Sequence, residues 1–194
     1  MELAGVRAAE RFDASLVSYD LTGLQPSLGQ AGYLDDFAQV PRLIVDSLVH
    51  ADALIVGSPV YMGSYTCLFK HQFDLIDPAA LIGKPILLTA TGGGDKHAPV
   101  IEHQLRPLFS LFEAASLPTG PYAGAADFQD GVPTSPAHLA RLERALSQFC
   151  PGCPGGNNAR LPRSGVTPAP NPTSSGASRA GGRPFTSGAF PHVP

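Results

Sequence analysis

Two continuous apolar runs, each closed by a turn signal, dominate the hydrophobic pattern of the chain. Residues 53–57 (ALIVG) are followed by Ser58 and Pro59, and residues 85–90 (PILLTA) are followed by Thr91 and three glycines. Strands that are buried on both faces of a parallel sheet carry uninterrupted runs of this kind. The pattern therefore predicts two strands of a parallel sheet.

Four segments show the three- and four-residue apolar spacing of helices with one buried face. They cover residues 33–50, 65–76, 98–115 and 136–149. Ser135 has the side chain of an N-cap, and Pro136 follows at the first helical position. Pro41 and Pro107 lie inside two of the segments, where we expect a kink or a division.

Two further β patterns complete the alternation of strands and helices. Residues 15–19 (SLVSY) are a short β-rich run, and residues 115–122 follow the third predicted helix. Parallel strands need helical crossovers, so the alternation predicts an α/β fold with a doubly wound parallel sheet. Ligands of such sheets bind at the carboxyl ends of strands, where loops 58–64 and 91–95 are expected.

Composition divides the chain near residue 150. From Pro151 onward it contains nine Pro, eight Gly and four Arg, and no Asp, Glu or Lys. Such a segment buries too little apolar surface to offset the entropy of ordering it. We therefore expect one domain over residues 1–150 and a disordered Pro/Gly/Arg-rich tail over residues 151–194.

Charge and cysteine content argue against several classes of protein. The net charge of -3 shows no concentrated basic face, so we expect no nucleic-acid partner. The N-terminus has no apolar signal segment and no run of about 18 apolar residues occurs, so we expect no membrane association. Three cysteines are too few to staple a secreted domain, which favours the cytoplasm. Cys150 and Cys153 have C-x-x-C spacing but no second ligand pair, and we interpret them as free thiols.

The central part of the chain resembles the flavodoxin-like NAD(P)H-dependent FMN reductases, in particular the branch associated with bacterial sulfonate utilisation. The resemblance spans residues 15–128 and is carried by GSPVYMGSYTCLFKHQFDLID followed by LIGKPILLTATGGGDKHAPVIEHQLRPLF. It implies a flavodoxin-like sheet, FMN as the cofactor, NADPH or NADH as the hydride donor and a homo-oligomer in which helix 65–76 makes contacts. Cys67 and Gln72 depart from the small and apolar residues expected at their positions.

The resemblance also implies that two loops bind the flavin ring. In the family, the loop after the third strand lies against the isoalloxazine ring, and the glycine loop after the fourth strand contacts its other edge. Glycines allow backbone N–H groups to approach ring atoms that a Cβ would obstruct. The alternative is that both loops are ordinary strand-to-helix turns. The matching residues are Pro59, Val60, Tyr61, Met62, Thr91, Gly92 and Gly93.

Other polar residues have less certain roles in this resemblance. His103 lies where the reductase branch resembles proteins with an inserted residue that forms a π-bulge, a feature that clusters at functional sites. A structural or surface role is the alternative for a lone helical His. No catalytic side chain is required, because the flavin itself accepts the hydride at N5. Lys70, Lys84 and Arg106 are equivalent candidates for contacting a dinucleotide phosphate.

The front of the chain departs from the family pattern. A complete member begins with an apolar strand and a Ser-rich loop that grips the FMN phosphate, whereas no such strand precedes Ser15. We expect residues 1–12 to be the end of the first helix, with Leu3, Val6 and Phe12 in the core. The sequence therefore predicts a fold without its first strand and phosphate loop.

Three functions stay open at this point. The leading one is transfer of hydride from NAD(P)H to FMN, which releases reduced flavin for a partner monooxygenase. A second enzymatic hypothesis is a quinone or azo reductase that retains its FMN. The third is a non-catalytic fragment that no longer binds flavin, and the missing phosphate loop is the feature that favours it.

The departure at the front predicts that this chain binds FMN little more tightly than riboflavin. Charge-assisted hydrogen bonds to the phosphate contribute about 1.5 to 3 kcal/mol each. Loss of two such bonds weakens FMN binding by roughly a hundredfold or more, since each 1.4 kcal/mol is about tenfold. Fluorescence-quenching titrations with both flavins measure the ratio, and a strong preference for FMN would contradict the prediction.

Overall fold

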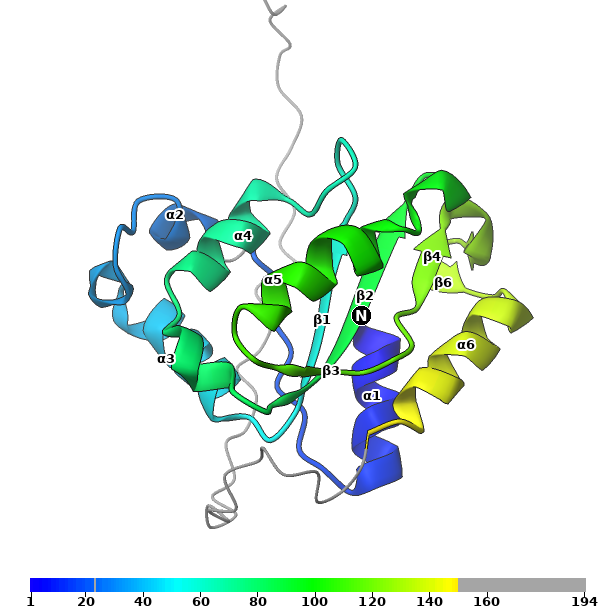
Figure 1. Cartoon of the computed structure of the whole chain (residues 1–194), viewed down its shortest axis with the longest axis horizontal. Helices are drawn as coiled ribbons and strands as arrows, with labels where there is room; N and C mark the ends of the chain where they lie inside the picture. Colours follow the sequence, from blue (N-terminus) through cyan, green and yellow to red (C-terminus); the bar gives the residue numbers. More distant parts are fainter. Residues whose placement is uncertain (23, 150–194) are drawn as a thin grey trace, which may run out of the picture. The chain divides into compact units, whose positions relative to one another are not determined.

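The structure, a computed structural model, describes residues 1–22 and 24–149. The predicted tail and the Cys150–Cys153 pair lie outside the described residues and stay predictions. In chain order the elements are α1 (Glu2–Phe12), α2 (Gln25–Leu28), η1 (Leu34–Asp36), α3 (Gln39–His50), β1 (Leu54–Pro59), α4 (Cys67–Asp74), η2 (Pro78–Leu81), β2 (Pro85–Gly92), η3 (Asp95–His97), η4 (Ile101–Leu105), α5 (Arg106–Ser110), β3 (Ala115–Ser116), β4 (Tyr122–Gly124), η5 (Ala125–Asp127), β5 (Phe128–Gln129), β6 (Val132–Pro133) and α6 (Pro136–Leu146) (Figure 1).

Strand β2 lies at the centre of a four-stranded parallel sheet. It pairs along its length with β1, from Leu54 opposite Ile86 to Pro59 opposite Thr91. Its other edge pairs with β3 near its start and with β4 near its end. All three pairings are parallel, which confirms the α/β class expected from the two apolar runs.

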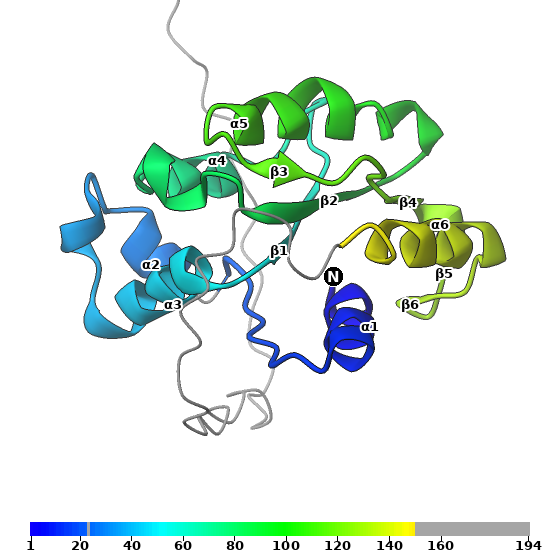
Figure 2. The ribbon, with the colours of Figure 1, turned by 60° about the horizontal axis from the view of Figure 1, so that its bottom comes forward.

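Helices cover both faces of this sheet (Figure 2). Successive side chains of a strand point to opposite faces, so each strand contributes to two cores. Val56 and Leu88 pack on one face with residues of α3, α4 and α5. Ile55 and Leu87 pack on the other face with residues of α1 and α6. This double burial explains why the two strands are apolar without interruption.

A cluster of phenylalanines fills the space between α4, α5 and the sheet. The ring centroids of Phe73 and Phe109 are 4.8 Å apart in an edge-to-face arrangement. Phe69 lies 4.9 Å from Phe73 by the same measure, and both α4 rings are buried. The apolar side of α4 therefore faces the core of its own fold.

The predicted strand over residues 15–19 is wrong. The segment is irregular, and the side chains of Leu16 and Val17 are 45% and 68% exposed. A β-rich run becomes a strand only where a neighbour completes its hydrogen bonds. Within the described residues no strand pairs with the edge of β1 that faces away from β2. Tyr19 alone is held, because its hydroxyl accepts a 2.7 Å hydrogen bond from the Gln72 amide.

That hydrogen bond also accounts for the polar residue found in the apolar face of α4. Gln72 is only 3% exposed, and its amide has a buried partner in the Tyr19 hydroxyl. Burial raises the pKa of Tyr19 to about 12, so the hydroxyl remains protonated at neutral pH. A buried amide with a partner is compatible with the core, whereas an unpaired one is not.

The helix at the front of the chain is present with a different buried face. Ala4 is buried, Leu3 is partly buried, and Phe12 makes an edge-to-face contact with Phe149. The prediction that Val6 lies in the core is wrong, since its side chain is 40% exposed.

The other helical segments follow the prediction with internal divisions. Residues 33–50 divide into η1 and α3, and Pro41 lies in the first turn of α3, where a missing N–H is tolerated. Residues 98–115 form the π-helix η4 and then α5, with Pro107 in the first turn of α5. The Ser135 hydroxyl caps α6 by accepting the His138 N–H at 3.3 Å, as expected.

The described part of the chain contains no helix long and apolar enough to cross a bilayer.

The sequence patterns missed the short helix α2 and the hairpin formed by β5 and β6. The predicted strand 115–122 is two short strands, β3 and β4, because Pro118 and Pro121 interrupt the segment between them.

Candidate functional site

The two predicted loops meet where β1 and β2 end. Pro59 lies opposite Thr91 in the last pair of the ladder. One residue further along, the Val60 N–H donates a 2.7 Å hydrogen bond to the Thr91 carbonyl. The structure therefore brings the residues expected at 59–62 and 91–93 to one end of the sheet, although their role in binding flavin stays a prediction.

The first loop ends in a tight, exposed turn. Tyr61 and Ser64 are joined by two backbone hydrogen bonds of 3.0 Å. Met62 and Gly63, between them, have φ values of 50° and 79°, which gives a turn with two left-handed residues. Tyr61 is 65% exposed and the Met62 side chain is fully exposed. The tip thus presents an aromatic ring and a thioether without burying either in its own fold.

The base of the same loop is fixed by a buried hydroxyl. Ser58 is 4% exposed, and its Oγ accepts the Thr66 N–H at 3.1 Å while donating to the Pro59 carbonyl at 2.9 Å. Thr66 in turn caps α4 by accepting the Phe69 N–H at 3.2 Å. The end of β1 and the start of α4 are therefore held together, and the exposed tip lies between them.

The glycine loop offers unpaired backbone donors. Within residues 1–22 and 24–149, the N–H groups of Gly93 and Gly94 have no hydrogen-bond partner. A Cβ added to Gly93 would meet no atom within 4 Å, whereas one added to Gly92 would lie 2.7 Å from the Tyr122 Oη. Unpaired backbone N–H groups of this kind can donate to the carbonyl and nitrogen acceptors of a ligand.

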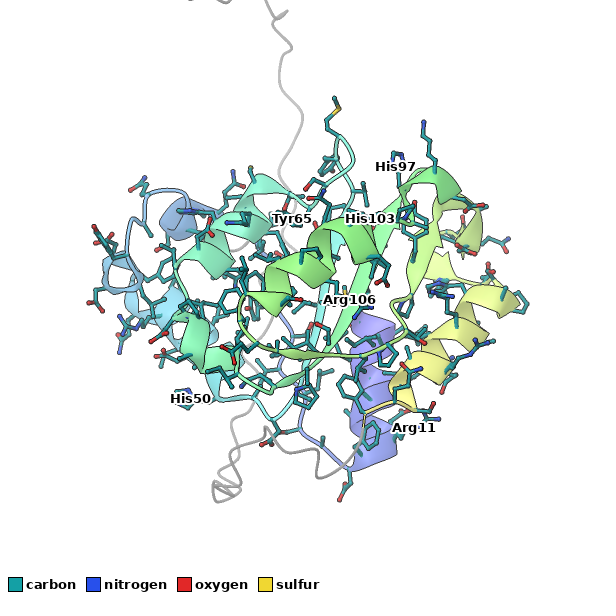
Figure 3. All side chains as sticks on the ribbon, viewed as in Figure 1. Arg11, His50, Tyr65, His97, His103 and Arg106 are labelled. Atoms are coloured by element: carbon teal, nitrogen blue, oxygen red, sulfur yellow. The ribbon has the colours of Figure 1, made fainter. Side chains whose placement is uncertain are left out.

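A π-helical segment lies beside the two loops. The Arg106 N–H donates to the Ile101 carbonyl five residues earlier, which confirms the expected π-bulge around His103. The Ser64 hydroxyl donates to the Gln104 side chain at 3.3 Å and so connects the first loop to this segment. Figure 3 labels His103 and His97 toward the same end of the fold as the loops. A direct role for His103 stays a prediction.

The three cations considered for a dinucleotide phosphate are all engaged elsewhere. Lys84 is buried, and its Nζ donates at 2.6 Å to two backbone carbonyls, those of Val49 and Ala51. Burial lowers the pKa of Lys84. Lys70 forms an ion pair with Asp74 on its own helix. These contacts exclude Lys84 from the site and leave Lys70 without an unpaired charge.

Arg106 also forms its contacts within the fold. Its guanidinium donates to both carboxylate oxygens of Glu102, at 2.6 and 2.9 Å, and to the Leu117 carbonyl at 3.1 Å. Hydrogen bonding to Arg106 lowers the pKa of Glu102. The sequence patterns named these cations but missed the contacts of Ser58. They also missed Ser64, Gln104 and Tyr122, whose partners are 28 to 40 positions away in the chain.

We predict that Ser58→Ala loosens the base of the first loop and destabilises the fold. The substitution leaves the Thr66 N–H without its buried acceptor, which costs about 1 to 3 kcal/mol. Urea unfolding followed by circular dichroism measures the loss. Ser147→Ala is the matched control, because its hydroxyl donates to a backbone carbonyl at an exposed position. Equal stability of the two variants would contradict the assigned role of Ser58.

Comparisons with known proteins agree with this geometry. The model of the NADPH-dependent FMN reductase family matches residues 4–129. The FMN reductase (NADPH) of Pseudomonas aeruginosa is 46% identical over 132 residues, which are 68% of this chain and 71% of that protein. The NADH-dependent FMN reductase SfnF of Pseudomonas fluorescens is 53% identical over 107 residues, which are 55% of this chain. The match covers only 57% of the length of SfnF.

A solved structure adds the fold. An oxidoreductase from Corynebacterium diphtheriae superposes with a TM-score of 0.66 at 33% identity, over 76% of this chain and 80% of that chain. The family model covers well over half of the sequence. The chain therefore belongs to the NADPH-dependent FMN reductase family and has a flavodoxin-like fold.

Proposed function

We propose that the protein transfers hydride from NADPH or NADH to FMN at the carboxyl ends of β1 and β2. One observation carries the proposal: beside the first loop, the N–H groups of Gly93 and Gly94 have no partner among the described residues, and a Cβ added to either glycine would meet no atom within 4 Å. Membership of the FMN reductase family supports it. When bound, FMN supplies the chemistry by accepting a hydride at N5, so that NAD(P)H becomes NAD(P)⁺.

The contribution of this chain is to bind and orient the ring. The glycine loop supplies N–H donors to ring acceptors, and the first loop supplies Val60, Tyr61 and Met62 as a covering surface. Pro59 and Thr91 hold the two loops in register at the ends of their strands. None of these groups exchanges a proton, which agrees with a reaction whose barrier is lowered by positioning two rings.

The product of this reaction is reduced flavin, and we propose that a partner monooxygenase consumes it. Similarity to SfnF supports a place in the sulfonate-utilisation branch. The relatives include both an NADPH-dependent and an NADH-dependent enzyme, so both nucleotides are included in the proposal. We place the activity in the cytoplasm, because three cysteines are too few to staple a secreted domain.

The two alternative functions, a cofactor-retaining reductase and a non-catalytic fragment, predict different experimental results. A quinone or azo reductase that retains its cofactor would keep a yellow colour through dialysis, whereas a flavin-releasing reductase would lose it. A fragment without flavin affinity would quench no flavin fluorescence at any protein concentration. Dialysis followed by titration therefore separates all three functions.

We predict that Gly93→Val weakens FMN and riboflavin to a similar degree, by tenfold or more, by crowding the ring. The substitution is tolerated by the chain itself, because the φ of Gly93 is not left-handed and its added Cβ would meet nothing within 4 Å. A loss of affinity then reports contact with the ligand. Fluorescence quenching gives both dissociation constants, and oxidation of NADPH and NADH at 340 nm gives the turnover.

The control for this variant is Ala140→Val, which places the same valine side chain at an exposed position of α6. We expect its flavin affinities to equal those of the unmodified chain. Unchanged affinities in Gly93→Val would place the ring elsewhere, and absence of binding by the unmodified chain would contradict the proposed function as a whole.

We also propose that the protein is a homo-oligomer. Phe69 and Phe73 offer no apolar surface for the expected contacts of helix 65–76, because both rings are buried in their own core. The exposed apolar side chains of Tyr61 and Met62 at the loop tip support the proposal, together with the homo-oligomer that the sequence resemblance implies.

We predict that light scattering at micromolar concentration gives a mass of at least two chains. A double variant, Tyr61→Ser with Met62→Ser, removes apolar surface that we expect a second copy to cover, and so shifts the mass toward one chain. A monomer from the unmodified protein would overturn the proposal. An unchanged oligomer from the double variant would place the interface on another surface.

A further inference from the structure

The side chain of Tyr122, on β4, lies across the glycine loop. Its hydroxyl donates a 2.7 Å hydrogen bond to the Gly94 carbonyl, 28 residues earlier in the chain. The same hydroxyl occupies the space beside Gly92, since an added Cβ there would lie 2.7 Å from Oη and 3.5 Å from Cζ. Tyr122 therefore contacts both ends of the three-glycine run and leaves Gly93 between them open.

The strand ladder fixes the position of this tyrosine. Tyr122 is opposite Ala90 in the pairing of β2 with β4, and Gly92 is opposite Gly124 two residues later. The Gly124 N–H donates to the Asp127 carboxylate at 2.8 Å, and the His138 Nδ1 lies 3.1 Å from the Tyr122 carbonyl. Backbone contacts on both sides thus hold Tyr122 while its side chain reaches the loop.

The Gly94 carbonyl is a fixed point at the end of a flexible run. It accepts two hydrogen bonds, from the Tyr122 hydroxyl and from the His97 N–H at 3.1 Å. Glycine loses more backbone entropy on ordering than any other residue, so consecutive glycines stay in one conformation only where contacts restrain them. The contacts at Gly92 and Gly94 supply that restraint before any ligand arrives.

We propose that Tyr122 is a positioning residue for the flavin ring: its hydroxyl aligns the N–H donors of Gly93 and Gly94 by holding the Gly94 carbonyl. The inference rests on the proposed function, because the N–H groups that Tyr122 orients are those proposed to bind the flavin. Tyr122 acts through the loop and need not touch the ring.

The hydroxyl is protonated under working conditions. Partial burial raises the pKa of Tyr122, and the nearby carboxylates of Asp95 and Asp127 act in the same direction. It therefore acts as a donor to the Gly94 carbonyl at neutral pH.

The first test is Tyr122→Phe, which removes the hydrogen bond and keeps the ring. We expect the dissociation constants of FMN and riboflavin to rise about five- to tenfold, the effect of one hydrogen bond. Flavin KM should rise similarly, whereas kcat at saturating flavin should change less than twofold, because the loop adopts the same bound arrangement once the ligand is in place. The control is Tyr33→Phe, which removes a hydroxyl from a tyrosine that is 78% exposed and should bind flavin as the unmodified chain does.

A second variant tests the contact independently. Gly92→Ala places a methyl group against the Tyr122 hydroxyl, and this conflict disappears in Tyr122→Phe because the next ring atom is 3.5 Å away. We expect Gly92→Ala to weaken flavin binding by tenfold or more in the unmodified chain and by less than threefold in the Tyr122→Phe background. Such non-additivity requires that the two residues act on the same loop conformation.

Several outcomes would overturn the inference. A lower melting temperature of Tyr122→Phe with unchanged flavin dissociation constants would make the contact structural. Additive effects of the two substitutions would show that the hydroxyl does not set the loop. Either of these results in a chain that binds flavin refutes this inference alone. An unmodified chain that binds no flavin refutes the proposed function first.

Discussion

The hydrogen-bond ladder of β2 is the constraint on which the rest of the structure depends. Residues 85–88 are buried, so the backbone groups of this strand can be satisfied only by neighbouring strands. That requirement fixes one register on each edge, with Pro59 opposite Thr91 and Gly92 opposite Gly124. The meeting of the two loops and the reach of Tyr122 to Gly94 both follow from these pairings.

The candidate site combines a fixed base with free groups. Ser58 and Thr66 hold the base of the first loop, and Tyr122 holds the end of the glycine run. Between these restraints lie the open N–H of Gly93 and the exposed Met62. A site of this kind needs little free energy to order its backbone when a ligand binds, and its exposed side chains can still adapt to the ligand.

Local patterns allowed much of the fold to be predicted from sequence. Apolar runs of five or six residues predicted β1 and β2, because burial on both faces leaves no polar position. Ser135 followed by Pro136 predicted the start of α6, because capping depends on residues adjacent in the chain. The glycine loop was equally visible, and the resemblance placed its residues at the correct end of the sheet.

Features that depend on distant partners could not be predicted in this way. Residues 15–19 have strand propensity but no hydrogen-bonding neighbour, and propensity alone does not supply one. Val6 fits the helical spacing, yet the face of α1 that packs is set by α6. The contact between Tyr122 and Gly94 joins residues that are 28 positions apart, so only the register of β4 against β2 reveals it.

The buried Lys84 has a consequence for the chemical reactivity of the molecule. The chain contains three lysines, Lys70, Lys84 and Lys96. Lys84 is enclosed between two carbonyls, and Lys70 is paired with Asp74, whereas Lys96 is exposed in η3, two residues beyond Gly94. Amine-directed acylation therefore discriminates among these side chains by accessibility, and a fluorophore attached at Lys96 would sit within a few residues of the glycine loop.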